Sequence, residues 1–185
     1  MSLRWLPNAI CVLRIVLVVP LVLALVAERY ELAVVLLVIA GGSDGLDGFL
    51  AKHFDWRTRV GGLLDPAADK LLIGSVFVTL TCLGHVPLAL AAIVILRDAV
   101  IVLGSLAYHV LIEPIRGEPA AISKANTACQ LAFVLFTLTT AAYGLPGGAV
   151  LVPLGAAVVF TSITSGLTYV LRWGRRAWRA AHAAA

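Results

Sequence analysis

Six long apolar stretches, separated by short polar connections, follow one another along this chain of 185 residues. Hydrophobic residues make up 61% of the sequence, and its mean hydropathy is +1.01. Each stretch approaches or exceeds the roughly 20 residues that a helix needs to cross the hydrocarbon layer. Since backbone amides in lipid must be satisfied internally, we expect an all-α integral membrane protein. The predicted fold is a single domain (1–185), a bundle of six transmembrane helices over residues 7–27, 31–51, 62–83, 88–112, 124–144 and 149–171.

Lysine and arginine gather on alternate connections, and this indicates how the bundle is oriented. They occur at the N-terminus, in the second and fourth connections and in a basic tail at 172–185, but not in the connections at 84–87 and 144–148. Both termini are therefore predicted to be cytoplasmic, in the inner (cell) membrane of a bacterium. No convincing cleavage site follows the first stretch, which disfavours a signal peptide. Beside a membrane, the net charge of +4 indicates attraction to anionic lipid rather than to nucleic acid.

Four aspartates, Asp44, Asp47, Asp65 and Asp69, lie at the end of the second stretch and the start of the third. A carboxylate at a helix centre in lipid costs roughly 2.5–3.5 kcal/mol and is usually kept for function. The spacings of three and four residues place each pair on one face of a helix. Two such pairs facing each other would form an oxygen-only site that suits Mg²⁺ or Mn²⁺. Taken singly, each aspartate is also compatible with a purely structural role. For example, Asp65 precedes Pro66, and proline suits the first turn of a helix, so this pair would simply start the third stretch.

The segment 44–69 reads D-x2-D-G-x2-A-K-x8-G-x3-D-x3-D. Here the chain resembles the CDP-alcohol phosphotransferase family, integral membrane enzymes that join phospholipid headgroups and share the signature D-x2-D-G-x2-A-R-x8-G-x3-D-x3-D. Only Lys52 departs from it, and lysine meets a phosphate as a point charge without the bidentate fork of arginine. The resemblance implies a reaction in which an alcohol attacks the β-phosphorus of a CDP-linked lipid and CMP leaves.

The resemblance also implies a role for each signature position. Asp44, Asp47, Asp65 and Asp69 would bind two divalent cations, Mg²⁺ or Mn²⁺, and Asp69 would also be the general base toward the acceptor hydroxyl. Small residues would let the nucleotide and the helices approach closely. Asn8 either contacts the nucleotide or caps its helix. The residues expected at the CDP-lipid are Pro7, Asn8, Gly48, Ala51, Lys52, Thr58 and Gly61.

The acceptor side is indicated by charged residues later in the chain. Arg97 and Asp98, inside the fourth stretch, either pair with each other or place Arg97 at the acceptor phosphate, and we favour the second reading. Members of the family that use glycerol phosphate resemble K-x-K-T-x-x-Q where this chain has Asn126 for the second lysine. Glycerol 3-phosphate carries nearly two negative charges and the phosphodiester of phosphatidylglycerol one, so losing a cation suits phosphatidylglycerol. The residues expected to bind the acceptor are Arg97, Arg116, Lys124 and Asn126.

The segments ILRDAVIVLGSLAY and ISKANTACQ also look like those of eukaryotic-type cardiolipin synthases. We therefore expect cardiolipin synthesis from CDP-diacylglycerol and phosphatidylglycerol, with a phosphatidylglycerophosphate synthase using glycerol 3-phosphate as the alternative. A divalent-cation transporter is the alternative from another class. Such proteins usually hold the ion at the midplane between two related halves, and no second half is evident here. The resemblance further implies a homodimer.

Two minor features complete the predictions. Cys11, Cys82 and Cys129 lie in different stretches, so we expect small buried hydrophobes rather than a disulfide or metal site. Gly41 and Gly45 have the spacing of small residues at a close helix contact. That contact is expected within the chain, with a dimer face as the other reading.

Overall fold

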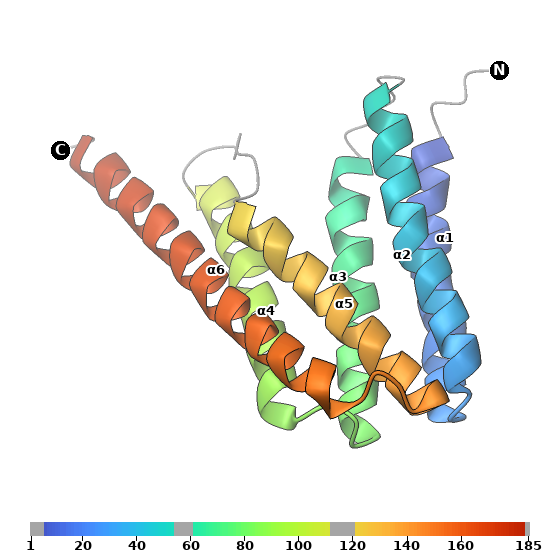
Figure 1. Cartoon of the computed structure of the whole chain (residues 1–185). Helices are drawn as coiled ribbons and strands as arrows, with labels where there is room; N and C mark the ends of the chain where they lie inside the picture. Colours follow the sequence, from blue (N-terminus) through green and yellow to red (C-terminus); the bar gives the residue numbers. More distant parts are fainter. Residues whose placement is uncertain (1–5, 54–60, 112–120, 184–185) are drawn as a thin grey trace.

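The computed structural model describes residues 6–53, 61–111 and 121–183. Within these ranges the side chains are described except at 6–8, 44–53, 61–65, 105–111, 121, 173 and 176–183. The elements of the described chain are all helices (Figure 1). They are α1 (Leu6–Val26), α2 (Tyr30–His53), α3 (Gly61–Cys82), α4 (Leu88–Leu111), α5 (Ala121–Tyr143) and α6 (Gly148–Ala183).

The apolar stretches predicted these helices well, with two differences. Helix α6 does not end near residue 171 but continues through the basic tail to Ala183, because arginine and alanine are strong helix formers even where the sequence is no longer apolar. Helix α3 begins at Gly61, so Asp65 and Pro66 lie in its second turn and do not start it.

Three helices of the described chain are long and apolar enough to cross a membrane, over Ala9–Val26, Ile122–Tyr143 and Gly148–Arg172. A shorter apolar segment covers Tyr30–Ser43 of α2. The outer faces of the bundle also carry large exposed apolar side chains, for example Leu23 and Val152. Lipid is the solvent that such faces suit, since water-soluble proteins rarely expose so much contiguous apolar surface.

Successive helices run in opposite directions (Figure 1). The helix ends that each connection joins therefore lie at one of the two ends of the bundle, alternating along the chain. The start of α1, the end of α2 and the start of α3 lie at one end, at the top of the view. The ends of α4 and α6 and the start of α5 point the same way. The turns after α1, α3 and α5 lie at the opposite end. The helix segments that carry the four aspartates are therefore gathered at one end.

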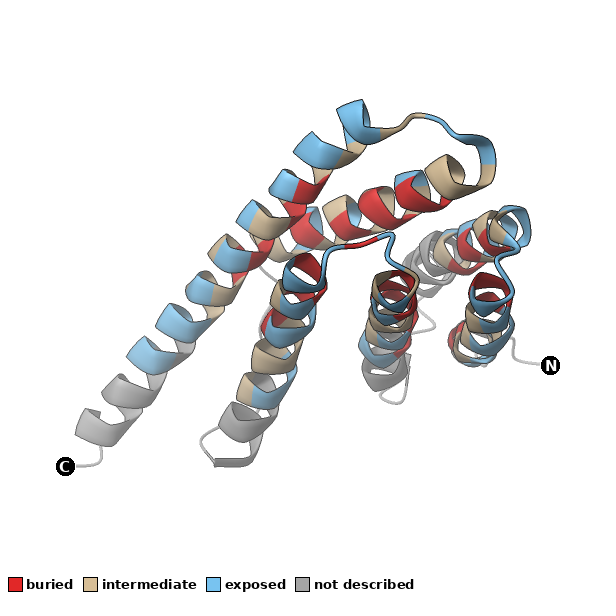
Figure 2. Ribbon diagram, turned by 90° about the horizontal axis from the view of Figure 1, so that it is seen from below, coloured by how far each residue is buried: buried red, intermediate tan, exposed pale blue. Residues whose placement is uncertain are grey.

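The helices pack as two groups of three. Helix α1 packs on α2 and α3, and α6 packs on α4 and α5. Contacts of α2 with α5, and smaller ones of α3 with α4 and α5, join the groups. Figure 2 shows the buried residues on the faces that look inward. Phe77 and Phe133 stack across the join with ring centroids 6.0 Å apart, within a core that includes Leu21, Leu25, Leu37, Leu80, Val94, Leu138 and Val158.

Two predictions about small residues can be compared with this packing. A Cβ added to Gly41 would lie 3.6 Å from the side chain of Leu131, an ordinary van der Waals contact, so Gly41 faces α5 within the chain without requiring a glycine there. Gly45 lies outside the described side chains. Cys11, Cys82 and Cys129 form no disulfide. Cys11 is buried and Cys129 is partly buried, but Cys82 is exposed at the end of α3, so the prediction of burial is wrong there.

Candidate functional site

The backbone places the aspartates as the spacing predicts. Asp44 and Asp47 lie three residues apart on the continuous helix α2, and Asp65 and Asp69 lie four apart near the start of α3. Of the four side chains, only that of Asp69 is among the described ones. No group of three or more His, Cys, Asp or Glu side chains that could hold a metal ion occurs among the described residues, a set that leaves out three of the four aspartates.

Asp69 is paired with an arginine from another helix. Arg14 Nη1 donates to Asp69 Oδ1 at 2.7 Å. The Arg14 side chain is fully buried, whereas Asp69 keeps 32% of its side-chain surface exposed. A guanidinium inside a helical bundle needs such a partner, because an unpaired charge there is very costly. The pair holds the Asp69 carboxylate in a fixed orientation while leaving part of it accessible.

Asp69 also lines a cavity of about 480 Å³ between α3, α4 and α5, here called the inner cavity. Its polar lining combines one carboxylate, three cationic side chains and two hydroxyls, and its apolar lining comes from all three helices. The lining residues are Pro66, Asp69, Lys70, Ile73, Arg97, Ile101, Ser123, Lys124, Thr127, Ala128 and Leu131. A cavity with this excess of cations suits an anionic ligand.

Arg97 is held in the wall of the inner cavity by three partners. Its Nη1 donates to Asp98 Oδ1 at 2.6 Å, and its Nη2 donates to the hydroxyls of Ser123 and Ser165, each at 2.6 Å. Arg97 is only 5% exposed, and its Nε has no hydrogen-bond partner among the described residues. The ion pair with Asp98, one of the two sequence readings, is thus present. Contact with an acceptor stays a prediction.

Lys70 belongs to the same charge network. Its ammonium contacts Asp98 Oδ1, the oxygen that also accepts from Arg97. Two cations therefore share one carboxylate, and a positive charge is left in excess beside the inner cavity. Lys124, exposed on the first turn of α5, adds another.

Asn126 lies apart from the inner cavity. It is fully buried, and its Oδ1 accepts hydrogen bonds from the hydroxyls of Thr161 and Ser162 of α6, each at 2.8 Å. It does not line the cavity, so its predicted contact with the acceptor has no support from this geometry and stays untested. The side chain of Gln130, one turn further on, is also fully buried, and none of its polar atoms has a partner among the described residues.

The other predicted site residues lie outside the described side chains. Gly48, Ala51 and Lys52 are on α2, Gly61 begins α3, and Pro7 and Asn8 are in the first turn of α1. Thr58 and Arg116 are in segments that the structure does not describe. Their roles stay predictions.

Sequence reasoning missed Arg14, Lys70, Ser123 and Ser165. Arg14 had a visible signal, since a lone cation in an apolar stretch needs a partner just as an aspartate does. Lys70 directly follows Asp69 and had a similar signal. Nothing in the sequence indicates that position 165 contacts position 97, because that contact depends on how α6 packs on α4.

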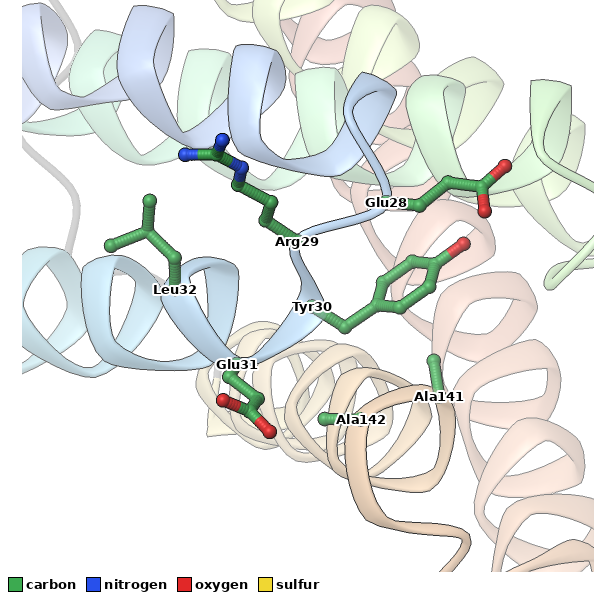
Figure 3. A pocket seen from close by; sticks show the side chains of 7 residues that line it. All are labelled: Glu28, Arg29, Tyr30, Glu31, Leu32, Ala141 and Ala142. Atoms are coloured by element: carbon green, nitrogen blue, oxygen red, sulfur yellow. The ribbon is translucent and has the colours of Figure 1, made fainter.

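A second pocket lies at the opposite end of the bundle, around the turn from α1 to α2 (Figure 3). Its charged side chains, those of Glu28, Arg29 and Glu31, point in different directions rather than converging. Tyr30 beside them is engaged by His85 through a 2.9 Å hydrogen bond between the hydroxyl and Nε2. This pocket has no arrangement that would hold a ligand.

Comparison with known proteins decides the family. The family model described as CDP-alcohol phosphatidyltransferase matches residues 4–169, which is most of the chain. The chain belongs to this family. It is therefore a member of a family of transferases, and the inner cavity lies beside an aspartate of the family's signature segment.

Relatives of two kinds are similar to this chain at comparable levels of identity. Human cardiolipin synthase (CMP-forming) is 31% identical over 186 residues, covering 92% of this chain and 62% of the human protein. A probable phosphatidylglycerophosphate synthase of Mycobacterium tuberculosis is 31% identical over 175 residues, covering 90% of this chain and 80% of the relative. The chain thus spans about three fifths of the human relative's length. Cardiolipin synthase (CMP-forming) of Streptomyces coelicolor is 42% identical over a shorter match of 69 residues, or 37% of this chain and 32% of the relative.

Proposed function

We propose that this protein is a metal-dependent phosphatidyltransferase that makes cardiolipin and CMP from CDP-diacylglycerol and phosphatidylglycerol. The observation that carries the proposal is the inner cavity, in which Asp69 and three cations from α3, α4 and α5 line one space. A carboxylate beside an anion-binding cavity is what the attack of a phosphate-bearing alcohol requires, since phosphoryl transfer depends mainly on positioning and charge neutralisation.

The residues of the signature segment fit a pair of divalent ions in their chemistry. Four carboxylates form an oxygen-only donor set, which suits Mg²⁺ or Mn²⁺. The continuous helices α2 and α3 keep each pair on one helical face. Asp44, Asp47, Asp65 and Asp69 would hold the ions, which when bound neutralise charge on the diphosphate of the CDP-lipid. Pro7, Asn8, Gly48, Ala51, Lys52, Thr58 and Gly61 would surround that lipid.

Residues of this chain account for the other parts of the transfer. The acceptor hydroxyl oxygen forms a bond to the β-phosphorus of CDP-diacylglycerol, the bond from that phosphorus to the bridging oxygen breaks, and CMP leaves with that oxygen. The acceptor's proton passes to the Asp69 carboxylate, which Arg14 orients through its 2.7 Å hydrogen bond. Arg97, Lys70 and Lys124 bind the acceptor's phosphate in the inner cavity, and Arg116 acts with them. Asn126, which lies apart from this cavity, would act on acceptor choice only by carrying no charge.

Charge favours phosphatidylglycerol over glycerol 3-phosphate as the acceptor. Asp98 neutralises one of the two cations that contact it, and position 126 carries no charge. The buried network therefore keeps one positive charge, which matches the single charge of a phosphodiester. The further positive charge of Lys124 is exposed, so water and salt screen it. The similarity of this chain to a probable phosphatidylglycerophosphate synthase supports glycerol 3-phosphate as the second candidate.

The proposal includes a setting for the enzyme. All six helices cross the inner membrane of a bacterial cell with both termini cytoplasmic, so the aspartates face the cytosol, and the protein acts as a homodimer. The exposed apolar side chains on the outer faces support a membrane setting. The start of α1 and the end of α6 lie at the same end of the bundle as the end of α2 and the start of α3, which supports termini and aspartates on one side (Figure 1).

The test is an assay of the purified full chain in lipid nanodiscs with CDP-diacylglycerol, Mn²⁺ or Mg²⁺ and either acceptor, followed by mass spectrometry of the lipid product. We expect cardiolipin and stoichiometric CMP with phosphatidylglycerol, no product after removal of divalent ions with EDTA, and loss of turnover in Asp69→Asn. Glu31→Gln, an isosteric change at the opposite end, is the matched control and should stay active. Phosphatidylglycerophosphate as the product would select the second candidate, and no CMP with any acceptor would refute the transferase.

A further inference from the structure

A second hollow on α3 adjoins the inner cavity and opens on the outer face of the bundle. Helix α3, which lies between α1 and α4 (Figure 1), forms its floor with Lys70, Leu71, Gly74 and Val78, and the walls are Val22 of α1 and Ile95 of α4. This outer groove has a volume of about 500 Å³. Lys70 lines both the outer groove and the inner cavity, so the two spaces meet at its side chain.

The outer groove is apolar along its length. Leu71, Val78 and Ile95 are 51%, 48% and 40% exposed, and they face the surroundings rather than the core. Ser75 and Thr79 also line the groove, but the Thr79 hydroxyl donates to the Ser75 carbonyl at 2.8 Å, so the helix itself satisfies its donor. The ten residues from Lys70 to Thr79 extend about 14 Å along α3. That is a long, mainly apolar surface, whose polar groups beyond the Lys70 end are the hydroxyls of Ser75 and Thr79.

The Lys70 end of the groove is positively charged. Lys70 and Arg97 share the Asp98 carboxylate, which leaves one positive charge in excess where groove and cavity meet. The Nε donor of the buried Arg97 has no partner among the described residues. An amphiphile with a negative headgroup and an apolar chain matches this polarity, with its headgroup in the inner cavity and its chain along α3.

We propose that the outer groove holds an acyl chain of the phosphatidylglycerol acceptor, which enters the inner cavity sideways from the bilayer between α1 and α4. This inference rests on the proposed function. The groove belongs to the acceptor rather than the CDP-lipid because it joins the inner cavity at Lys70, whose carboxylate partner Asp98 also binds Arg97. The residues expected at the CDP-lipid are instead on α2 and at the starts of α1 and α3. A water-soluble glycerol phosphate has no chain to occupy it.

Gly74 offers a direct test because it is the floor of the groove. A Cβ added there meets no atom within 4 Å, so a larger side chain enters open space rather than the core. Gly74→Phe fills the groove. Val152→Phe, which places the same aromatic ring at a 73% exposed position of α6, is the control. Gly74→Ala adds a single methyl group and shows whether loss of the glycine alone has an effect.

We expect Gly74→Phe to raise the KM for phosphatidylglycerol about tenfold with little change in kcat, as loss of uniform binding does. The KM for CDP-diacylglycerol, and turnover of the deacylated acceptor glycerophosphoglycerol, should match those of the unmodified protein. Val152→Phe and Gly74→Ala should leave all of these values unchanged. If the wild-type protein makes cardiolipin and Gly74→Phe has an unaltered KM for phosphatidylglycerol, the role of the groove is refuted while the proposed function stands. Wild-type protein that makes no cardiolipin refutes the proposed acceptor instead.

A binding measurement that needs no turnover identifies the occupant. Phosphatidylglycerol with a photoreactive diazirine on one acyl chain should label residues 71–79, and unlabelled phosphatidylglycerol should compete, whereas Gly74→Phe should abolish the labelling. Labelling of the same residues by a diazirine CDP-diacylglycerol, uncompeted by phosphatidylglycerol, would assign the groove to the donor. Disulfide-linked dimers of Val78→Cys in a chain without other cysteines would show that a second copy covers it. Either result would overturn the proposal.

Discussion

At the scale of single residues, the charges inside this bundle occur as partnered groups rather than alone. Arg14 pairs with Asp69 across α1 and α3, and Asp98 serves both Lys70 and Arg97. Burying a guanidinium costs several kcal/mol unless its donors are satisfied, so such groups persist where they position something. Here each network ends at a side chain that lines the inner cavity.

Arg14→Met tests the first of these pairs. Without the guanidinium the Asp69 carboxylate loses its orienting partner, and we expect kcat for CMP release to fall roughly a hundredfold, as misplacement by about 1 Å can do. The free energy of unfolding should drop by about 1.5–3 kcal/mol, the usual contribution of a hydrogen bond to a charged group. Arg14→Lys should recover part of kcat, and Arg29→Met, at an exposed position at the other end, should change neither quantity. Full kcat in a folded Arg14→Met protein would contradict the assigned role.

Ser165→Ala tests how Arg97 is held. The substitution removes one 2.6 Å partner of Nη2 and leaves Ser123 and Asp98 in place. We expect the KM for the acceptor to rise about threefold to tenfold, corresponding to a net hydrogen bond of about 0.5–1.5 kcal/mol, while kcat stays nearly constant. Thr164→Ala is the neighbouring control, because that exposed hydroxyl donates only to the Phe160 carbonyl of its own helix. Equal effects of the two changes on KM would argue against a specific role of Ser165.

At the scale of helices, the second group of three depends on a small residue. A Cβ added to Gly155 of α6 would lie 3.2 Å from Phe133 of α5 and 3.3 Å from Leu90 of α4. The absent side chain is what lets α6 approach both partners, as small residues do at helix contacts in lipid. The buried hydroxyls of α6 then come within reach of Asn126 and Arg97.

Gly155→Val should therefore destabilise the α4–α5–α6 group by about 1–3 kcal/mol, the usual effect of overpacking. A lower thermal midpoint in detergent is the expected readout. Gly174→Val is the control in the same helix, because an added Cβ there meets no atom within 4 Å. An unchanged midpoint for Gly155→Val would show that α6 can shift without loss.

Helix positions were predictable because lipid imposes one rule on every apolar stretch, namely that its backbone be helical. The end of α6 was not, since hydropathy marks where a chain leaves hydrocarbon and not where its helix stops. The family and the aspartate positions followed from a fixed spacing. The inner cavity did not, because it depends on which helices neighbour α3. Arg97 could be picked from its burial cost, whereas its partner Ser165 follows only from the packing of α6 on α4.

At the scale of the whole molecule, the alternating helix directions bring the aspartate-bearing helix ends to one end of the bundle and three turns to the other (Figure 1). With the proposed function, nucleotide would reach the aspartates from one side of the membrane only. The charge pattern of the connections predicts that this side is the cytoplasm.

Labelling of single cysteines in intact cells tests this orientation. In a chain without its own cysteines, Glu28→Cys and His85→Cys, at the turns after α1 and α3, should react with a membrane-impermeant maleimide added outside. Arg172→Cys and Arg175→Cys, on the last turns of α6 that the structure describes with side chains, should react only after permeabilisation. The opposite pattern would invert the proposed topology, and labelling of both sets from one side would show that the helices do not all cross.

The way Arg97 is held has a consequence for how acceptor choice is adjusted. Its Nη2 donates to the Ser165 hydroxyl of α6, and its Cγ lies 3.7 Å from where a Cβ of Gly166 would be, yet none of the α6 residues with described side chains lines the inner cavity. Substitutions at these α6 positions can therefore shift the Arg97 guanidinium, which is proposed to bind the acceptor phosphate, without altering the residues that line the cavity. Variant libraries designed to change the headgroup preference should therefore begin with positions 165 and 166, which do not line the inner cavity.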